Sequence, residues 1–330
     1  MNNVTPPYFE DFTIGQTFSE PAVTLTSGHA VLHQALFGDR MRLPLDHHLS
    51  NKVTGNKHAL VHPNLVANLV IGQTTTPSQR VKGNLFYRGL TFEAPVFLGD
   101  TLNTQTKIIA LRSNKPKPNR DATGMVLLEI EAHNNKSERV MHFWRCPMIA
   151  CREAKPPTDR NDDFDNLTTS ASMDNIVGVC PTNWQLSEFS QQLLPMFSDL
   201  VEGQEIAIEA RDTITCAPEL VRSTLNMAMT HTDAGSSYLN ERLVYGGHVI
   251  SMAFAQATRA LPSMVTILGW FQCDHLAPVT EGDRIQTKVL IEHLHPLETG
   301  GVAKIRVRST SESNGTTKPV LDWQVATLLA

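Results

Sequence analysis

The chain repeats itself at a fixed spacing of 183 residues, and this repeat limits the folds that it can adopt. Leu60 to Thr75 (LVHPNLVANLVIGQTT) aligns with Leu243 to Thr258 (LVYGGHVISMAFAQAT), and Phe92 to Thr106 aligns at the same spacing with the segment that begins at His275. Two separate matches at one offset indicate a duplicated unit. Segments further upstream match at a spacing of 188 residues, so the first half holds about five extra residues between Gln16 and Leu60.

Composition divides the chain near its middle. Residues 151–175 are rich in Asp, Asn, Ser and Thr and poor in apolar residues, which is typical of a linker. We therefore expect an N-terminal repeat in residues 1–150, a linker in residues 151–175 and a C-terminal repeat in residues 176–330. Each repeat shows the same order of elements, in which a longer apolar helix precedes several strands with alternating apolar residues.

The longer helices are expected at Pro63 to Thr74 and at Gly247 to Leu261. Small and apolar residues occupy nearly all sides of both segments, which predicts burial. Pro63 suits a first helical position, and Pro262 is expected to end the second helix. A buried helix wrapped by a curved antiparallel sheet, occurring twice, is an α+β architecture.

Composition and charge limit the classes of function. Hydrophobic residues make up 41% of the chain and charged residues 18%, an ordinary globular mix without an apolar run long enough to cross a membrane. The net charge of -5 argues against a nucleic-acid binder. The first residues resemble no signal peptide, so the expected compartment is the cytoplasm. Five cysteines without CxxC pairs favour reduced thiols over a disulfide framework or a metal site.

Several segments carry a pattern that covers most of the chain outside the linker. They are FGDRMRLPLDHHLS (Phe37 to Ser50), LVHP, IGQTT, NLFYRGLTFEAPVFLGDTL, HFWRC, RLVYGGHVISMAFAQATRALP and CDHLAPVTEGD. Together they resemble the MaoC-like, R-specific enoyl-CoA hydratases. The resemblance implies two tandem hotdog repeats, each a curved antiparallel sheet wrapped round a central helix, that form a pseudo-dimer.

The same resemblance implies a hydro-lyase that adds water reversibly to the double bond of an enoyl-CoA. Within the family, the likeness is greatest to members that convert mesaconyl-CoA to β-methylmalyl-CoA. The expected substrate is then an acyl-CoA, with no cofactor, no metal, no nucleic acid and no membrane as partner, and a homodimer is compatible with it. Two alternatives on the same fold stay open: a hotdog acyl-CoA thioesterase, and a non-catalytic acyl-CoA-binding protein.

The family motif, Gly-Asp-x-Asn-Pro-x-His, carries the acid and base groups on one short segment. Gly38, Asp39 and Pro44 match it in part, but the candidate histidines lie eight and nine residues beyond Asp39. The extra residues of the first half are expected to form a longer loop that restores the geometry. The resemblance then makes Asp39 and His47 catalytic, with His48 as the alternate to His47. The other interpretation is that Asp39 caps a turn and that the two histidines form a solvated surface cluster.

The corresponding segment of the second half is LNMAMTHTD. It contains His231, but Asn226 stands five residues before it, where the motif has the acid. An amide cannot act as a general base. We therefore expect the second half to be catalytically lapsed and to shape the acyl-CoA tunnel, with His231 as an ordinary core or surface histidine.

Stabilisation of the enolate requires free N–H groups at a helix start. In the first half His62 and Pro63 occupy that place, and proline has no N–H, so the N–H of Asn64 is one candidate. In the second half Tyr245, Gly246 and Gly247 occupy it, and the glycines would let a thioester approach closely. A tight turn before a buried helix explains the glycine pair equally well.

Three arginines are candidates for binding a substrate carboxylate. Arg88 follows an aromatic pair, and Arg40 and Arg42 lie in the motif segment. An arginine binds a carboxylate through two parallel hydrogen bonds, which a substrate such as mesaconyl-CoA would require. Each of the three is also consistent with an ordinary surface charge.

Overall fold

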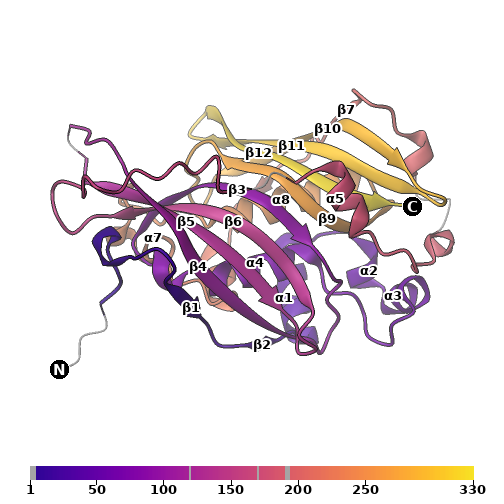
Figure 1. The fold of residues 1–330 in the computed structure, drawn as a ribbon. Helices are drawn as coiled ribbons and strands as arrows, with labels where there is room; N and C mark the ends of the chain where they lie inside the picture. Colours follow the sequence, from indigo (N-terminus) through magenta and orange to yellow (C-terminus); the bar gives the residue numbers. More distant parts are fainter. Residues whose placement is uncertain (1–4, 119, 169–170, 190–193) are drawn as a thin grey trace.

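A computed structural model describes residues 5–118, 120–168, 171–189 and 194–330, and its strands form one antiparallel sheet (Figure 1). The strands of the first half are β1 (Thr17–Ser19), β2 (Val23–Thr24), β3 (Val81–Phe92), β4 (Thr101–Ser113), β5 (Thr123–His133) and β6 (Arg139–Ala150). Those of the second half are β7 (Glu205–Ala207), β8 (Asp212–Thr213), β9 (Met264–His275), β10 (Arg284–Pro296), β11 (Gly301–Ser313) and β12 (Thr316–Leu329). The helices are α1 (Ser27–Phe37), α2 (Arg42–Leu45), α3 (His47–Thr54), α4 (Pro63–Gln73), α5 (Met173–Gly178), α6 (Ala217–Ser223), α7 (Met229–Thr232) and α8 (Gly246–Ala260).

The sheet is built from two copies of one pattern that meet at a seam. Its order is β1-β4-β5-β6-β3-β9-β12-β11-β10-β7, with β2 beside β4 and β8 beside β10. At the seam β3 and β9 pair antiparallel, with Tyr87 opposite Cys273 and Leu90 opposite Trp270. The predicted tandem hotdog fold is confirmed, and the two sheets are continuous through the seam. The domain boundaries stay a prediction; β6 ends at Ala150 and α5 begins at Met173.

The two long helices lie against each other under the curved sheet. Every residue of α4 is buried, and α8 is buried from Gly247 to Thr258, as the apolar pattern predicts. The Asn68 amide donates a 2.8 Å hydrogen bond to Ser251 Oγ. These two positions are 183 residues apart, so the bond joins equivalent points of the two repeats. Within the described residues, no helix is long and apolar enough to cross a membrane.

Close packing at the C-terminal end of α4 depends on a glycine. A Cβ atom at Gly72 would lie 1.8 Å from the carbonyl oxygen of Thr224, which follows α6 in the second half. A backbone atom cannot move away as a flexible side chain can. The contact between the repeats therefore requires glycine at this position.

We expect Gly72→Ala to destabilise the chain by about 1–3 kcal/mol, the usual effect of overpacking a dense core. The matched control is Gly178→Ala, because a Cβ at Gly178 would meet no atom within 4 Å. Urea denaturation followed by circular dichroism measures both variants. Equal midpoints for Gly72→Ala and Gly178→Ala would contradict the packing argument.

Candidate active site

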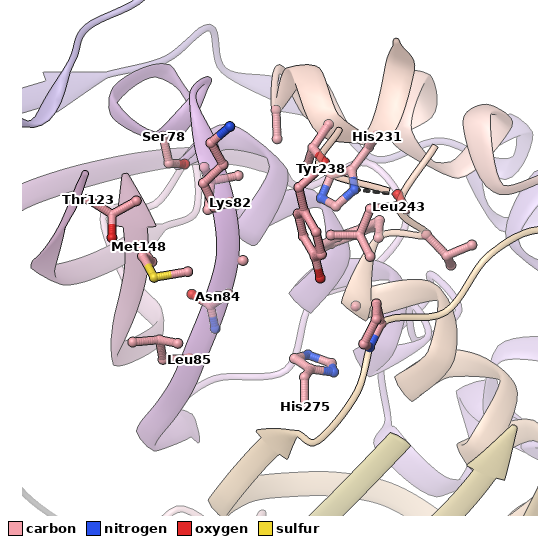
Figure 2. A pocket seen from close by; sticks show the side chains of 18 of the residues that line it. Ser78, Lys82, Asn84, Leu85, Thr123, Met148, His231, Tyr238, Leu243 and His275 are labelled. Carbon is pink, nitrogen blue, oxygen red and sulfur yellow. Dashed lines mark hydrogen bonds between the residues drawn. The ribbon is translucent and has the colours of Figure 1, made fainter. Parts of the chain in front are cut away.

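A cavity of about 990 Å³ lies at the junction of the two repeats (Figure 2). The first half contributes β3, the connection between β4 and β5, and part of β6 to its lining, while the second half contributes α7, the start of α8 and the end of β9. Lys82 and Asn84 of β3 lie across the cavity from His231 and Tyr238 (Figure 2). A ligand site at this junction is what the repeat predicts, since such junctions favour binding.

The equivalent place in the first half is filled. A second pocket there measures only about 30 Å³. Eight of its lining residues lie 183 positions before eight that line the large cavity: Leu60, Val61, Pro63, Val66, Phe92, Ala94, Pro95 and Val96. Val179, Pro181 and Trp184, from the segment between β6 and β7, complete its wall. The two pockets are therefore counterparts, and this segment closes one of them.

Asp39 lies beside this filled pocket and pairs with His62. Its side chain is 1% exposed, and its Oδ2 lies 3.2 Å from Nε2 of His62. Oδ1 accepts the N–H of Met41 at 2.8 Å. Nδ1 of His62 in turn accepts the N–H of Asn64 at 3.1 Å, so the ring proton lies on Nε2 and faces the carboxylate. The pair thereby caps the N-terminus of α4.

The surroundings of the pair favour an ionised carboxylate. Burial raises the pKa of Asp39, but the neighbouring His62, the Met41 N–H and His33 act against it, and the net pKa lies below its usual value of 3.8. The ring of His33 stacks on that of His62 with centroids 4.5 Å apart. Burial, with His62 beside it, holds the pKa of His33 well below 6.5.

The structure does not bring Asp39 together with His47 or His48. The extra residues of the first half lie in the short helix α3 instead of the expected loop, and α2 has its counterpart in α7 of the second half. Leu49 and Val53 of α3 are buried, which leaves both histidines on its exposed face. This arrangement matches the alternative in which the two histidines form a solvated surface cluster.

Two other predicted ligand contacts are also absent among the described residues. The N–H of Asn64 is donated to His62, so it is not free for an enolate. Arg88 lies 3.3 Å from Asp274 and over the ring of Phe86, outside the cavity lining.

The motif arginines lie away from the cavity as well. Arg42 covers the ring of Phe189 at 5.9 Å. Arg40 is exposed. Neither side chain lines the large cavity.

The second half has the same local geometry around different side chains. Asn226 corresponds to Asp39, because Oδ1 of Asn226 accepts the N–H of Ala228 at 3.0 Å, two residues on, as Asp39 accepts that of Met41. Asn226 lines the large cavity. Its amide N–H₂ group is left as a donor, because Oδ1 is the atom engaged by the backbone.

Among the described residues, one imidazole nitrogen of His231 has no hydrogen-bond partner. Nδ1 donates to the carbonyl oxygen of Leu243 at 2.7 Å, the dashed contact in Figure 2, so in the neutral ring Nε2 carries the lone pair. Burial, opposed by the Leu243 hydrogen bond and aided by the charge of Arg145, lowers the pKa of His231 to about 4. The imidazole is therefore neutral at pH 7 and can accept a proton.

The N-terminus of α8 opens towards this imidazole. Among the described residues no side chain caps α8, in contrast to α4, and Gly246 at its first position lines the cavity. A Cβ at Gly246 would lie 2.4 Å from Nε2 of His275, and a Cβ at Gly247 would lie 2.0 Å from Oδ1 of Asn68. Tyr245, the predicted third member of this group, lines the cavity beside them. Only glycines permit these contacts, and they leave unpaired N–H groups at the positive end of the helix dipole.

Sequence reasoning missed His275, which lies where the first half has Phe92. Burial lowers the pKa of His275 to about 4, with His231 contributing in the same direction. The cavity thus contains two neutral imidazoles and one helix N-terminus. The alignment of the repeats could have indicated this residue, because a histidine stands there in place of a phenylalanine. The alignment does not indicate what the histidine does.

Comparisons with known proteins agree with this architecture. A conserved hypothetical protein of Mycobacterium tuberculosis with a double hotdog fold is 39% identical, with 98% of each chain covered and a TM-score of 0.90. The β-methylmalyl-CoA dehydratase of Chloroflexus aurantiacus is 28% identical over 92% of this chain and 87% of its own. The mesaconyl-CoA hydratase of Cereibacter sphaeroides is 26% identical over 94% and 90%. No protein-family model matches the chain.

We expect Asp39→Asn to lower the free energy of unfolding at pH 7 by about 1–3 kcal/mol, because the buried negative charge beside His62 is lost. A carboxylate with a lowered pKa stabilises the fold above its usual pKa, and this contribution is lost as the pH falls through the folded-state value. The difference from the parent chain should therefore shrink below about pH 4.

Urea denaturation at pH 7 and at pH 3.5 measures this difference. Asp165→Asn is the control, because Asp165 is exposed and should show no difference at either pH. A deficit of equal size at both pH values would rule out an ionised Asp39 as its source.

Proposed function

Because the chain belongs to the double-hotdog family of MaoC-like hydratases and dehydratases, we propose that it is a hydro-lyase that adds water reversibly to the double bond of an enoyl-CoA. The finer proposal is that mesaconyl-CoA is the substrate and β-methylmalyl-CoA the product, as the names of its relatives suggest. The observation that carries the proposal is the free Nε2 of His231 in a cavity that also contains the uncapped start of α8.

The proposed reaction uses these groups in sequence. Nε2 of His231 takes a proton from a water molecule whose oxygen adds to the β-carbon. Negative charge then develops on the thioester oxygen, where the N–H of Gly246 can stabilise it. The imidazolium returns the proton to the α-carbon, which restores the neutral ring. The amide of Asn226 donates to the water and orients it, a role that does not require a base.

The mouth of the cavity suits the phosphates of CoA. Lys115, Lys117 and Arg120 are exposed and line the cavity on the connection between β4 and β5, and Lys82 of β3 stands close by. Basic side chains raise the local concentration of a phosphorylated ligand and steer it inwards. The acyl end would then lie deeper, near His231.

A thioesterase is less consistent with this cavity. A hotdog thioesterase requires a carboxylate at the thioester. Among the described residues, the one acidic side chain that lines the cavity is Asp121, which is 82% exposed and lies 3.7 Å from Lys82. This carboxylate belongs to the mouth of the cavity and not to the region of His231.

The first half supplies the competing hydratase site, in which Asp39 acts with His47 or His48. Under our proposal His231→Ala should lower kcat/KM for mesaconyl-CoA hydration by about 10²-fold or more, the effect of losing general acid–base catalysis. Asp39→Asn and His47→Ala should keep most of the activity at a temperature where they are folded. The measurement is loss of enoyl-thioester absorbance, with circular dichroism as the check on folding.

The opposite pattern, with activity kept in His231→Ala and lost in Asp39→Asn or His47→Ala, would place the chemistry in the first half. Release of free thiol without loss of the double bond would indicate a thioesterase. Binding of the thioester with neither reaction would indicate a non-catalytic acyl-CoA-binding protein. His48→Ala distinguishes the two histidines of α3.

The CoA orientation makes a separate prediction. The double variant Lys115→Gln/Lys117→Gln should raise KM several-fold with little change in kcat, and the effect should diminish at high salt because exposed charges are screened. Lys136→Gln is the control, since Lys136 is an exposed lysine outside the cavity lining. An unchanged KM in the double variant would contradict this orientation of the ligand.

A further inference from the structure

Arg145, on β6, is a buried cation in the wall of the cavity. The residue is 3% exposed. Its Nη2 donates to the carbonyl oxygen of Thr74 at 2.8 Å and to Ser78 Oγ at 2.7 Å. Its Nε has no hydrogen-bond partner among the described residues. Both partners of the guanidinium are neutral groups.

No carboxylate of the described residues lies within ion-pair distance of Arg145. Two half-buried arginines of this sheet do have a carboxylate partner: Arg88 pairs with Asp274 and Arg306 with Asp322. A buried charge is normally paired, because removing it from water costs several kcal/mol. Burial lowers the pKa of Arg145 from 12.5, but a guanidinium keeps its proton at neutral pH.

Part of the missing negative charge comes from the backbone. Thr74 follows the last residue of α4, so its carbonyl lies at the negative end of that helix dipole. This contact uses one nitrogen of the guanidinium. The N–H groups of Nε and Nη1 remain for another acceptor, and a carboxylate oxygen is a strong acceptor for a guanidinium N–H.

The neighbours of Arg145 lie at the chemical end of the cavity. Tyr87, Tyr245 and His231 line it together with Arg145. The hydroxyl of Tyr245 is buried and also lacks a partner among the described residues. An unpaired cation and an unpaired hydroxyl thus lie beside the proposed base, while the basic residues for the CoA phosphates lie at the mouth.

We propose that Arg145 binds a free carboxylate on the acyl group, so that the site selects enoyl-CoA substrates whose acyl chain carries a second acid group. This inference rests on the proposed function and adds a specificity-determining residue to it. The carboxylate of the substrate supplies the negative charge that no described side chain provides for Arg145. An acyl chain without a carboxylate would leave the guanidinium unpaired and would bind more weakly.

Binding of saturated thioesters tests the inference without turnover. Methylsuccinyl-CoA, which carries the carboxylate, and butyryl-CoA, which lacks it, are titrated calorimetrically into the full chain. We expect methylsuccinyl-CoA to bind at least about 10-fold more tightly, the effect of one charged hydrogen-bonded pair. Arg145→Gln should abolish this preference, and Arg88→Gln, the matched control, should keep it.

Several results would overturn the inference. Equal binding of the two thioesters to the unmodified chain would do so whether or not a variant folds. An equal loss of affinity for both ligands in Arg145→Gln would show that the arginine only caps the C-terminus of α4 and does not bind the carboxylate. Arg145→Lys keeps the charge but has fewer N–H groups and no planar guanidinium, so we expect it to retain only part of the preference.

Turnover separates this inference from the proposed function. If the chain hydrates crotonyl-CoA and mesaconyl-CoA with equal kcat/KM, the proposed function stands and the role of Arg145 is wrong. If methylsuccinyl-CoA is preferred and neither enoyl-CoA is hydrated, the proposed function is wrong and the carboxylate site stands. Preference for mesaconyl-CoA over crotonyl-CoA that disappears in Arg145→Gln, with crotonyl-CoA still hydrated, supports both.

Discussion

A buried helix start must find partners for its unpaired N–H groups, and the two repeats meet this requirement in opposite ways. In the first half His62 accepts the N–H of Asn64 and is itself held by the carboxylate of Asp39. In the second half Tyr245 stands at the position of His62, and among the described residues no side chain caps α8. One helix start is closed by His62 with the carboxylate of Asp39 beside it, and the other opens into a cavity where a ligand oxygen can take the place of the cap.

The duplication explains why both arrangements coexist in one chain. Asn68 and Ser251 join equivalent points of the central helices, and β3 pairs with β9 across the seam, so neither repeat is packed independently of the other. The first-half pocket is closed by Trp184 and its neighbours, while its counterpart stays open. The closed half has no ligand to bind, so its side chains serve packing alone. This explains why a carboxylate and an imidazole, Asp39 and His62, act there as a helix cap.

The sequence was sufficient to predict the architecture but did not point to the site that we propose. A spacing of 183 residues and two apolar helices specify two repeats, because these signals depend on patterns over many residues. The local motif was misleading, because Asp39 and His47 are close in sequence while α3 directs the histidine to solvent. Arg145 was hidden for the same reason, since an arginine within a strand pattern does not reveal whether an acid faces it. Whether a carboxylate lies opposite an arginine depends on which distant strands pair, and a single sequence does not give this pairing.

Closure of one pocket also determines how many ligands a chain can hold. Two separate hotdog chains that associate symmetrically have two equivalent sites, and occupancy of one can influence the other. In this chain the segment that contains Val179 and Trp184 closes the pocket of the first half, so one of the two sites is lost. If the open cavity binds the thioester as we propose, the stoichiometry is one thioester per two repeats, and binding to a single chain follows a hyperbolic saturation curve. Any cooperativity would have to arise between chains.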